Sequence, residues 1–198
     1  MKISEHKLHG TDDLMGVIKN ATLRGLPYVN PYDGAKITLE FANKSDIVPT
    51  QRFVLQDQLD IIKTLDKSFS KHGVNILSNS GFITYSVADN EVPYTFTPPI
   101  IEVIDGQPLL IDGIHRITYA GKRPFLAIFI NGVPKEFYPY QIGLKGGWNE
   151  VQTFQSKLPA GFVPKQSRYS EEDRKKYFRE YPFPGQIKIM REHSKIKY

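Results

Sequence analysis

Five consecutive residues, Asp112-Gly113-Ile114-His115-Arg116, combine the residue types that bind phosphate. A phosphate-binding turn needs backbone N–H groups aimed at the anion, a residue without a side chain where the backbone comes close, and a helix behind the turn. Gly113 allows the close approach, Arg116 can hold phosphate oxygens with two N–H groups, and His115 adds a ring donor. Asp112 would repel phosphate, so we expect it to hold Mg²⁺ or to fix the loop.

The same five residues also suit a turn that binds no ligand. Asp-Gly favours a tight turn, Asp112 can cap the following helix, and His115 and Arg116 can be exposed residues of its first turn. Taken alone, the stretch favours this structural interpretation. The neighbouring sequence therefore has to decide between a turn and a site.

Hydrophobic periodicity and turn residues predict the elements around the turn. The segment 56–71 has apolar residues at every third or fourth position, as on one face of a helix. Asp105-Gly106 is a hairpin turn signal between two apolar segments. In chain order we predict strand 37–42, helix 56–71, strand 99–104, strand 107–111, helix 115–120 and strand 124–130.

With the elements in this order, LLIDGIHRITYAG followed by PFLAIFI resembles the ParB/sulfiredoxin superfamily, whose core has a strand, a Gly-to-Arg turn, a helix and a strand. The segment SDIVPTQRFVLQDQLDIIKTLDKSFSKHGV is similar to the region that precedes this turn in the superfamily. The resemblance covers 37–133. It implies an α+β core, a small mixed sheet packed with helices, followed by a C-terminal extension at 134–198. A length of 198 residues suits a single domain over 1–198.

The resemblance implies a nucleotide site at the turn. The superfamily holds nucleotide phosphates there, which assigns Gly113, Ile114, His115 and Arg116 to ATP or another nucleoside triphosphate. Asp112 matches the acidic residue of the Asp-Gly-His-His-Arg motif of free-serine kinases. The resemblance therefore implies that Asp112 contacts the nucleotide and binds Mg²⁺. Sulfiredoxin chemistry needs a cysteine where this chain has Ile114, and the chain has no cysteine at all. Sulfinic-acid repair is therefore excluded.

ATP hydrolysis, with DNA cleavage as a second activity, is the function that the resemblance favours. A ParB role in chromosome partitioning is disfavoured, because no helix-turn-helix pattern follows the core. A core with a basic C-terminal end resembles most the plasmid fertility-inhibition proteins of the superfamily, which block DNA transfer. If the chain has this function, a protein of the DNA-transfer machinery is an expected partner. Two alternatives stay open: a small-molecule kinase of the free-serine-kinase type, and a non-enzymatic inhibitor or adaptor that binds DNA or protein.

Two further residues are candidates for the same site. Glu102 lies on the strand predicted at 99–104 and could be the general base if its face lines the cleft; otherwise it is an exposed strand carboxylate. Arg52 precedes the long helix, where members of the superfamily place polar groups that meet the nucleotide. It is either a second phosphate contact or a surface arginine.

The C-terminal part carries the net charge. From Lys165 onward there are ten Lys and Arg against five Asp and Glu, which leaves 16 of each elsewhere and places the whole +5 in this part. A basic end on a neutral body suits nucleic acid or an acidic protein. The pattern from Ser170 to Tyr181 predicts a helix, with acids in its first turn and bases later. Aromatic residues stand among its basic residues, so the helix either packs its aromatics on the core or binds nucleic acid by stacking and phosphate contacts. The basic residues in question are Arg174, Lys175, Lys176 and Arg179.

Composition excludes several other classes of protein. Without cysteine there are no disulfides, no Cys-ligated zinc and no thiol catalysis. No P-loop or Rossmann glycine motif occurs. The apolar run 124–130 is too short to cross a membrane, and the polar N-terminus does not resemble a signal peptide. From these features we expect a soluble, cytoplasmic protein.

Overall fold

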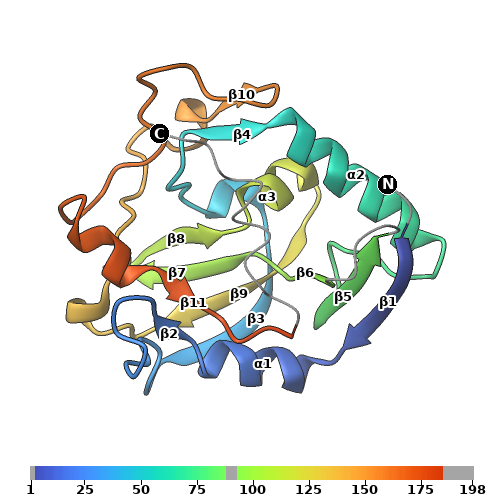
Figure 1. Ribbon diagram of the computed structural model, residues 1–198, viewed down its shortest axis with the longest axis horizontal. Coiled ribbons are helices and arrows are strands. Elements are labelled where there is room, and N and C mark those ends of the chain that lie inside the picture. The colour runs from blue at the N-terminus through green and yellow to red at the C-terminus, as the bar shows by residue number, and fades with distance from the viewer. Residues whose placement is uncertain (1–2, 88–92, 185–198) are drawn as a thin grey trace.

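The computed structural model describes residues 3–87 and 93–184 and has an α+β architecture (Figure 1). Within these residues the α-helices are α1 (Thr11–Lys19), α2 (Gln56–Ser70) and α3 (Ile114–Ala120). Short 3-10 helices occupy Lys44–Asp46 (η1), Lys135–Phe137 (η2), Gly147–Glu150 (η3) and Asp173–Tyr177 (η4). The predicted α+β class is confirmed.

A four-stranded mixed sheet lies at the centre of the molecule. Its strand order is β3 (Lys36–Ala42), β9 (Phe125–Asn131), β7 (Ile100–Ile104) and β8 (Gln107–Asp112). β7 and β9 are parallel, whereas β3–β9 and β7–β8 are antiparallel. The β7–β8 turn has positive φ at both central residues, Asp105 (51°) and Gly106 (77°), as a type I′ hairpin requires. The elements predicted around the turn are thus confirmed to within two residues.

Other strands of the described residues form three smaller sheets. β1 (Ile3–His9), β5 (Phe82–Val87) and β6 (Tyr94–Phe96) make an antiparallel sheet in the order β1-β5-β6. β4 (Phe53–Leu55) pairs in parallel with β10 (Gln152–Phe154), and β2 (Thr22–Leu23) pairs with β11 (Arg179–Glu180).

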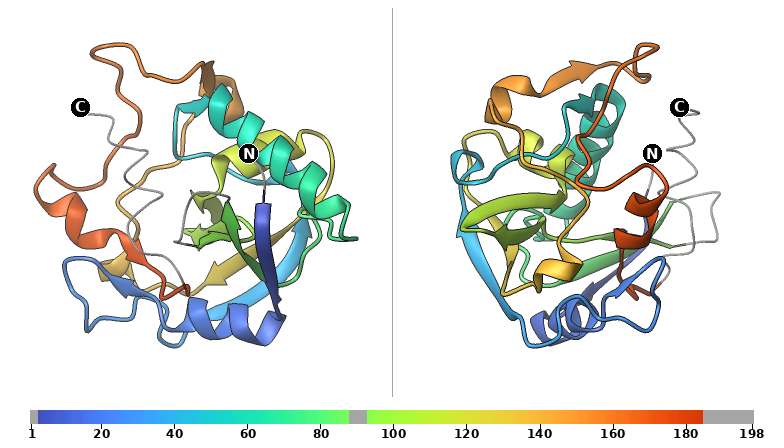
Figure 2. Two further views of the ribbon diagram at one scale, coloured as in Figure 1. Left: turned by 45° about the vertical axis from the view of Figure 1, so that its right-hand side comes forward. Right: turned by 90° about the vertical axis from the view of Figure 1, so that its left-hand side faces the viewer.

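Each face of the central sheet covers its own hydrophobic core. Because side chains alternate along a strand, Ile101 of β7 packs with α2 and α3, whereas Ile100 and Ile104 pack with α1. Figures 1 and 2 show α1 on the opposite side of the sheet from α2 and α3. The core beneath α1 also contains Phe183, so the C-terminal part contributes to it.

The helix predicted over 170–181 is wrong. The Ser170 hydroxyl does accept the Asp173 N–H at 3.1 Å, but the helical turn that it starts is the five-residue η4. The backbone is extended at Phe178 and continues into β11, which pairs with β2 and places the Arg179 side chain in the interior. Tertiary pairing therefore overrides the local helix signal.

The segment 157–166 packs along β4 rather than spanning open solvent. Its Pro164 carbonyl accepts the Arg52 N–H at 2.9 Å, and Lys165 forms a β-bridge with Gln51. In the part of the chain that the structure describes, no helix has the length and apolar character that crossing a membrane requires.

Candidate nucleotide site

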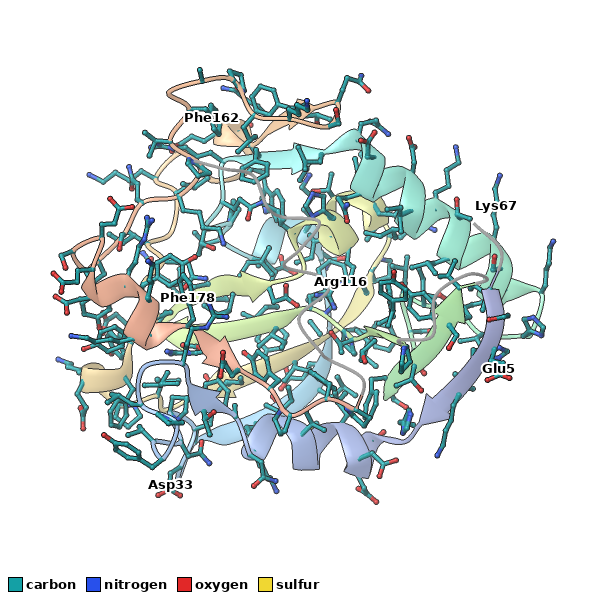
Figure 3. All side chains as sticks on the ribbon, viewed as in Figure 1. Glu5, Asp33, Lys67, Arg116, Phe162 and Phe178 are labelled. Carbon is teal, nitrogen blue, oxygen red and sulfur yellow. The ribbon has the colours of Figure 1, made fainter. Side chains whose placement is uncertain are left out.

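The predicted turn lines a cavity of about 200 Å³. All five residues from Asp112 to Arg116 contribute to its wall. β8 ends at Asp112 and α3 begins at Ile114, so the end of a strand and the start of a helix position the turn. Figure 3 shows Arg116, a residue of α3, near the middle of the molecule.

The cavity has an apolar part and a polar part. Ile61 and Leu65 of α2 line it together with the aromatic rings of Tyr85 and Phe96. Polar side chains from other elements complete the wall, among them Gln51 and Lys165. The cavity therefore offers apolar surface to one part of a ligand and charge to another.

Gly113 is required by its backbone and by its packing. Its φ is 107°, a region that residues with a side chain rarely adopt. A Cβ at this position would lie 2.9 Å from the Pro99 Cβ and 3.2 Å from Arg116 Nε. The atoms that come close to Gly113 thus belong to Pro99 and Arg116 of the protein itself. The structural interpretation of this residue holds independently of any ligand.

Arg116 connects the turn to the segment that leads into β7. Its Nη1 donates to the carbonyl and the hydroxyl of Thr97 and to the Pro98 carbonyl, and its Nη2 donates to Asp112. Among the described residues, Nε has no hydrogen-bond acceptor. The guanidinium thus has a structural role and keeps its Nε–H for a ligand.

His115 is a neutral ring at the cavity wall. Burial lowers its pKa to about 4, with Arg116 and Lys165 acting in the same direction and Asp112 opposing them. Its Nε2 lies 3.0 Å from the Leu55 N–H and accepts that hydrogen bond. The proton of a neutral ring with this bond is on Nδ1. His115 therefore holds the start of α2 and keeps one donor.

Lys165 is a cation at the cavity that the sequence analysis did not assign. It comes from the segment 157–166, where no motif distinguishes it from other lysines. Its ammonium lies 3.3 Å from the Tyr140 hydroxyl and 5.7 Å from the centre of the Tyr140 ring. The β-bridge to Gln51 brings it across from the turn.

Arg52 is not part of the cavity wall. Its Nε lies 3.3 Å from a carboxylate oxygen of Glu150, and the same carboxylate accepts the Gly146 N–H. The Arg52 backbone holds β10 and the 157–166 segment in place. Its predicted contact with phosphate would require this ion pair to open.

Neither alternative for Glu102 is found in the structure: it does not line the cavity, and it is not exposed. Glu102 is completely buried on the opposite face of β7, where its carboxylate accepts from Arg179 Nε and Nη2, both at 2.8 Å. The Tyr32 hydroxyl donates to it at 2.8 Å and lies 2.9 Å from the Tyr181 hydroxyl. Burial, followed by the charge of Glu102, raises the pKa of both tyrosines.

The same ion pair removes Arg179 from the predicted nucleic-acid surface, because its side chain is buried. Two other residues of that set are on the surface and paired: Arg174 with Glu171 at 2.9 Å and Lys176 with Asp173 at 2.7 Å. Lys175 is exposed. Much of the C-terminal positive charge falls at 185–198, outside the described residues.

Asp112 can bind Mg²⁺ as predicted, but as the one carboxylate among the described residues of the cavity wall. No cluster of three or more metal-binding side chains occurs in 3–87 or 93–184. Mg²⁺ commonly takes one or two protein carboxylates and completes its octahedron with phosphates and water. Asp112 can therefore supply one ligand to a metal that arrives with a nucleotide.

Comparisons with known proteins place the chain in a family. A search of curated proteins and a search of solved structures each found no match. A family model for the ParB CE domain matches residues 13–152, which are 140 of the 198 residues. The match includes most of α1, the whole central sheet and the turn at 112–116. This chain therefore belongs to the ParB CE domain family.

Proposed function

We propose that the cavity binds a nucleoside triphosphate such as ATP, with the phosphates toward 112–116 and Lys165, and that the protein hydrolyses it with Mg²⁺. One observation carries the proposal: a single cavity combines the predicted turn and a second cation with apolar and aromatic surface. A nucleotide has the matching parts, an anionic chain and a planar base. The ParB relationship and the α+β fold are consistent with this function.

The charges at the cavity favour an anion. Arg116 and Lys165 are cations, Asp112 is an anion and His115 is neutral, so the described wall carries an excess of one positive charge. Arg116 Nε–H and His115 Nδ1–H add donors that the described residues leave available. Hydrogen bonds to ionised groups contribute about 1.5–3 kcal/mol each.

For ATP hydrolysis, Asp112 is the residue that can orient the attacking water or bind Mg²⁺. Glu102 is on the other face of the sheet, which removes it as a general base. Asp112, with more than half of its side chain exposed, can orient a water or hold one position of Mg²⁺. When bound, Mg²⁺ neutralises phosphate charge.

Titration calorimetry with ATP and Mg²⁺ tests the binding site, and Lys165→Ala is the sharpest variant. Lys165 touches the cavity without the backbone contacts of Arg116, so we expect an intact fold and an affinity lower by roughly tenfold to hundredfold. Lys157→Ala is the matched control, since Lys157 is exposed on the same segment. Equal affinities of the two variants would contradict the proposal.

The product identifies the reaction. Inorganic phosphate released from ATP, without any acceptor, supports hydrolysis. A stable phosphorylated metabolite would replace this assignment with a small-molecule kinase. Cleavage of a DNA substrate that persists in Lys165→Ala would place a nuclease activity elsewhere in the chain.

A further inference from the structure

One edge of the central sheet has no backbone partner among the described residues. β3 is the outer strand of the order β3-β9-β7-β8, and it pairs with β9 along its whole length. No other backbone hydrogen bond of the described residues reaches 36–42. The right-hand view in Figure 2 shows β3 along the outline of the molecule. An uncovered strand of seven residues can pair with a further strand.

The two faces of β3 differ in chemistry. Lys36, Thr38 and Glu40 share one face, because successive side chains alternate. The other face carries Ile37, Leu39 and Phe41. Phe41 is 64% exposed, which is unusual for a large aromatic side chain within a strand. An occupant of this edge therefore has to cover an apolar face and match two opposite charges.

We propose that a second copy of this chain occupies the edge, with β3 antiparallel to β3 about a two-fold axis at Thr38. In this register Lys36 of one copy lies opposite Glu40 of the other, and the symmetry forms the pair twice. On the other face Ile37 lies opposite Leu39, and Phe41 lies diagonal to Ile37 of the partner copy. Directly opposite side chains are about 4.5–5.5 Å apart at Cβ, within reach of both kinds of contact.

Other symmetric registers lack these contacts. An axis at Lys36 or at Glu40 places two like charges directly opposite each other, which is destabilising. An axis at Ile37 places Lys36 opposite Thr38, and an axis at Leu39 places Glu40 opposite Thr38, so neither forms an ion pair. The axis at Thr38 is thus the one that uses both charges and the apolar face.

This assembly would join two four-stranded sheets into a continuous one. It removes both β3 edges, a recognised way of protecting exposed strands. β8, which leads into the turn at 112–116, is the opposite edge of the sheet. The dimer therefore leaves both cavities free, and it is independent of the nucleotide proposal.

Light scattering coupled to size-exclusion chromatography tests the dimer with the full chain. We expect twice the 22.6 kDa of one chain in the micromolar range. Glu40→Lys should give a monomer, because it places Lys36 opposite a lysine at both contacts. Glu5→Lys is the matched control, since Glu5 is an exposed carboxylate on β1, an edge strand of the β1-β5-β6 sheet, and this variant should remain dimeric. A monomeric unmodified protein, or a Glu40→Lys variant that stays dimeric, would overturn the proposal.

A charge exchange distinguishes this register from other modes of association. Lys36→Glu should also be monomeric, whereas mixing it with Glu40→Lys should form a heterodimer with one ion pair reversed and the other as in the unmodified protein. The double variant Lys36→Glu/Glu40→Lys should recover the homodimer. Circular dichroism verifies that each variant is folded. Folded single variants that fail to associate on mixing would exclude the Thr38 register.

Discussion

Two arginine–carboxylate pairs lie on opposite faces of the central sheet, and they differ in almost every physical respect. Arg179 and Glu102 are 2% and 0% exposed, and they face the core that contains Tyr32. Arg116 and Asp112 are 14% and 57% exposed and line the cavity on the other face. Each pair joins a sheet strand to a later element of the chain.

The buried pair has little remaining capacity to bind anything else. Both Glu102 oxygens accept from Arg179, and one of them also accepts from Tyr32. Arg179 donates further to the carbonyls of Tyr177 and Phe137. The cavity pair, by contrast, keeps Arg116 Nε–H and an exposed carboxylate. The same residue types thus stabilise the fold on one face and can meet a ligand on the other.

The largest effect should follow from breaking the buried pair. Arg179→Met leaves the Glu102 carboxylate buried without its cation, which typically costs about 3–5 kcal/mol of unfolding free energy. Urea denaturation measures this loss. The double variant Glu102→Leu/Arg179→Met removes both charges and should recover most of the stability. If Arg179→Met is as stable as the unmodified protein, the contrast between the two faces fails.

Acid should affect the cavity face through His115. An unfolded histidine takes up a proton near pH 6.5, whereas burial lowers the pKa of His115 to about 4. The native state then binds fewer protons between these values, so its stability falls as the pH drops from 6.5 to 4. At about 1.4 kcal/mol per unit the loss reaches about 3 kcal/mol.

His115→Gln isolates this contribution, since an amide oxygen can still accept from Leu55 and does not titrate. Chemical denaturation at a series of pH values should show the stability difference between the two proteins shifting in favour of the variant below pH 6.5. Parallel pH profiles would mean that His115 is not buried as a neutral ring.

Replacing Arg116 should cost less than replacing Arg179, because the cavity pair is partly exposed. Arg116→Gln loses the charged hydrogen bonds to Thr97 and Asp112, with an expected loss of about 1.5–3 kcal/mol. It should also abolish ATP binding, as measured by calorimetry below the unfolding transition. A variant that loses stability but still binds ATP like the unmodified protein would assign Arg116 a structural role alone.

The smallest effect on stability is expected for Asp112→Asn. Exposed ion pairs contribute at most about 1 kcal/mol, so the midpoint of urea denaturation should change little. The Mg²⁺ dependence of ATP binding should nevertheless weaken, since the variant loses the carboxylate at the cavity. An unchanged response to Mg²⁺ would remove Asp112 as a metal ligand.

The sequence predicted the elements next to the turn because each has a local signal. α2 has a regular apolar period, and Asp105-Gly106 marks the β7–β8 hairpin. β1 was missed, since ISEHKLH is largely polar and its pairing with β5 joins residues about 80 positions apart. A pattern within one segment contains no information about such a partner.

The candidate site shows the same limit. The turn at 112–116 was found from adjacent residues, whereas Lys165 reaches the cavity from a segment without a motif. Alternation correctly separates Glu102 from Ile101 on β7, but it cannot tell which face of the sheet is open. Here both faces are covered, and Arg179, 77 residues later, neutralises the buried carboxylate.

That separation along the chain has a consequence for biosynthesis. Glu102 leaves the ribosome 77 residues before Arg179, and at about 5–20 residues per second the interval lasts about 4–15 s. During this time Arg179, the cation that neutralises the buried Glu102 carboxylate, has not been synthesised. Phe183, which packs in the same core, is also missing. The face of the sheet beneath α1 therefore stays hydrated until Arg179 and Phe183 have been synthesised. A ribosome-bound chain should bury this core only after Phe183 has left the exit tunnel.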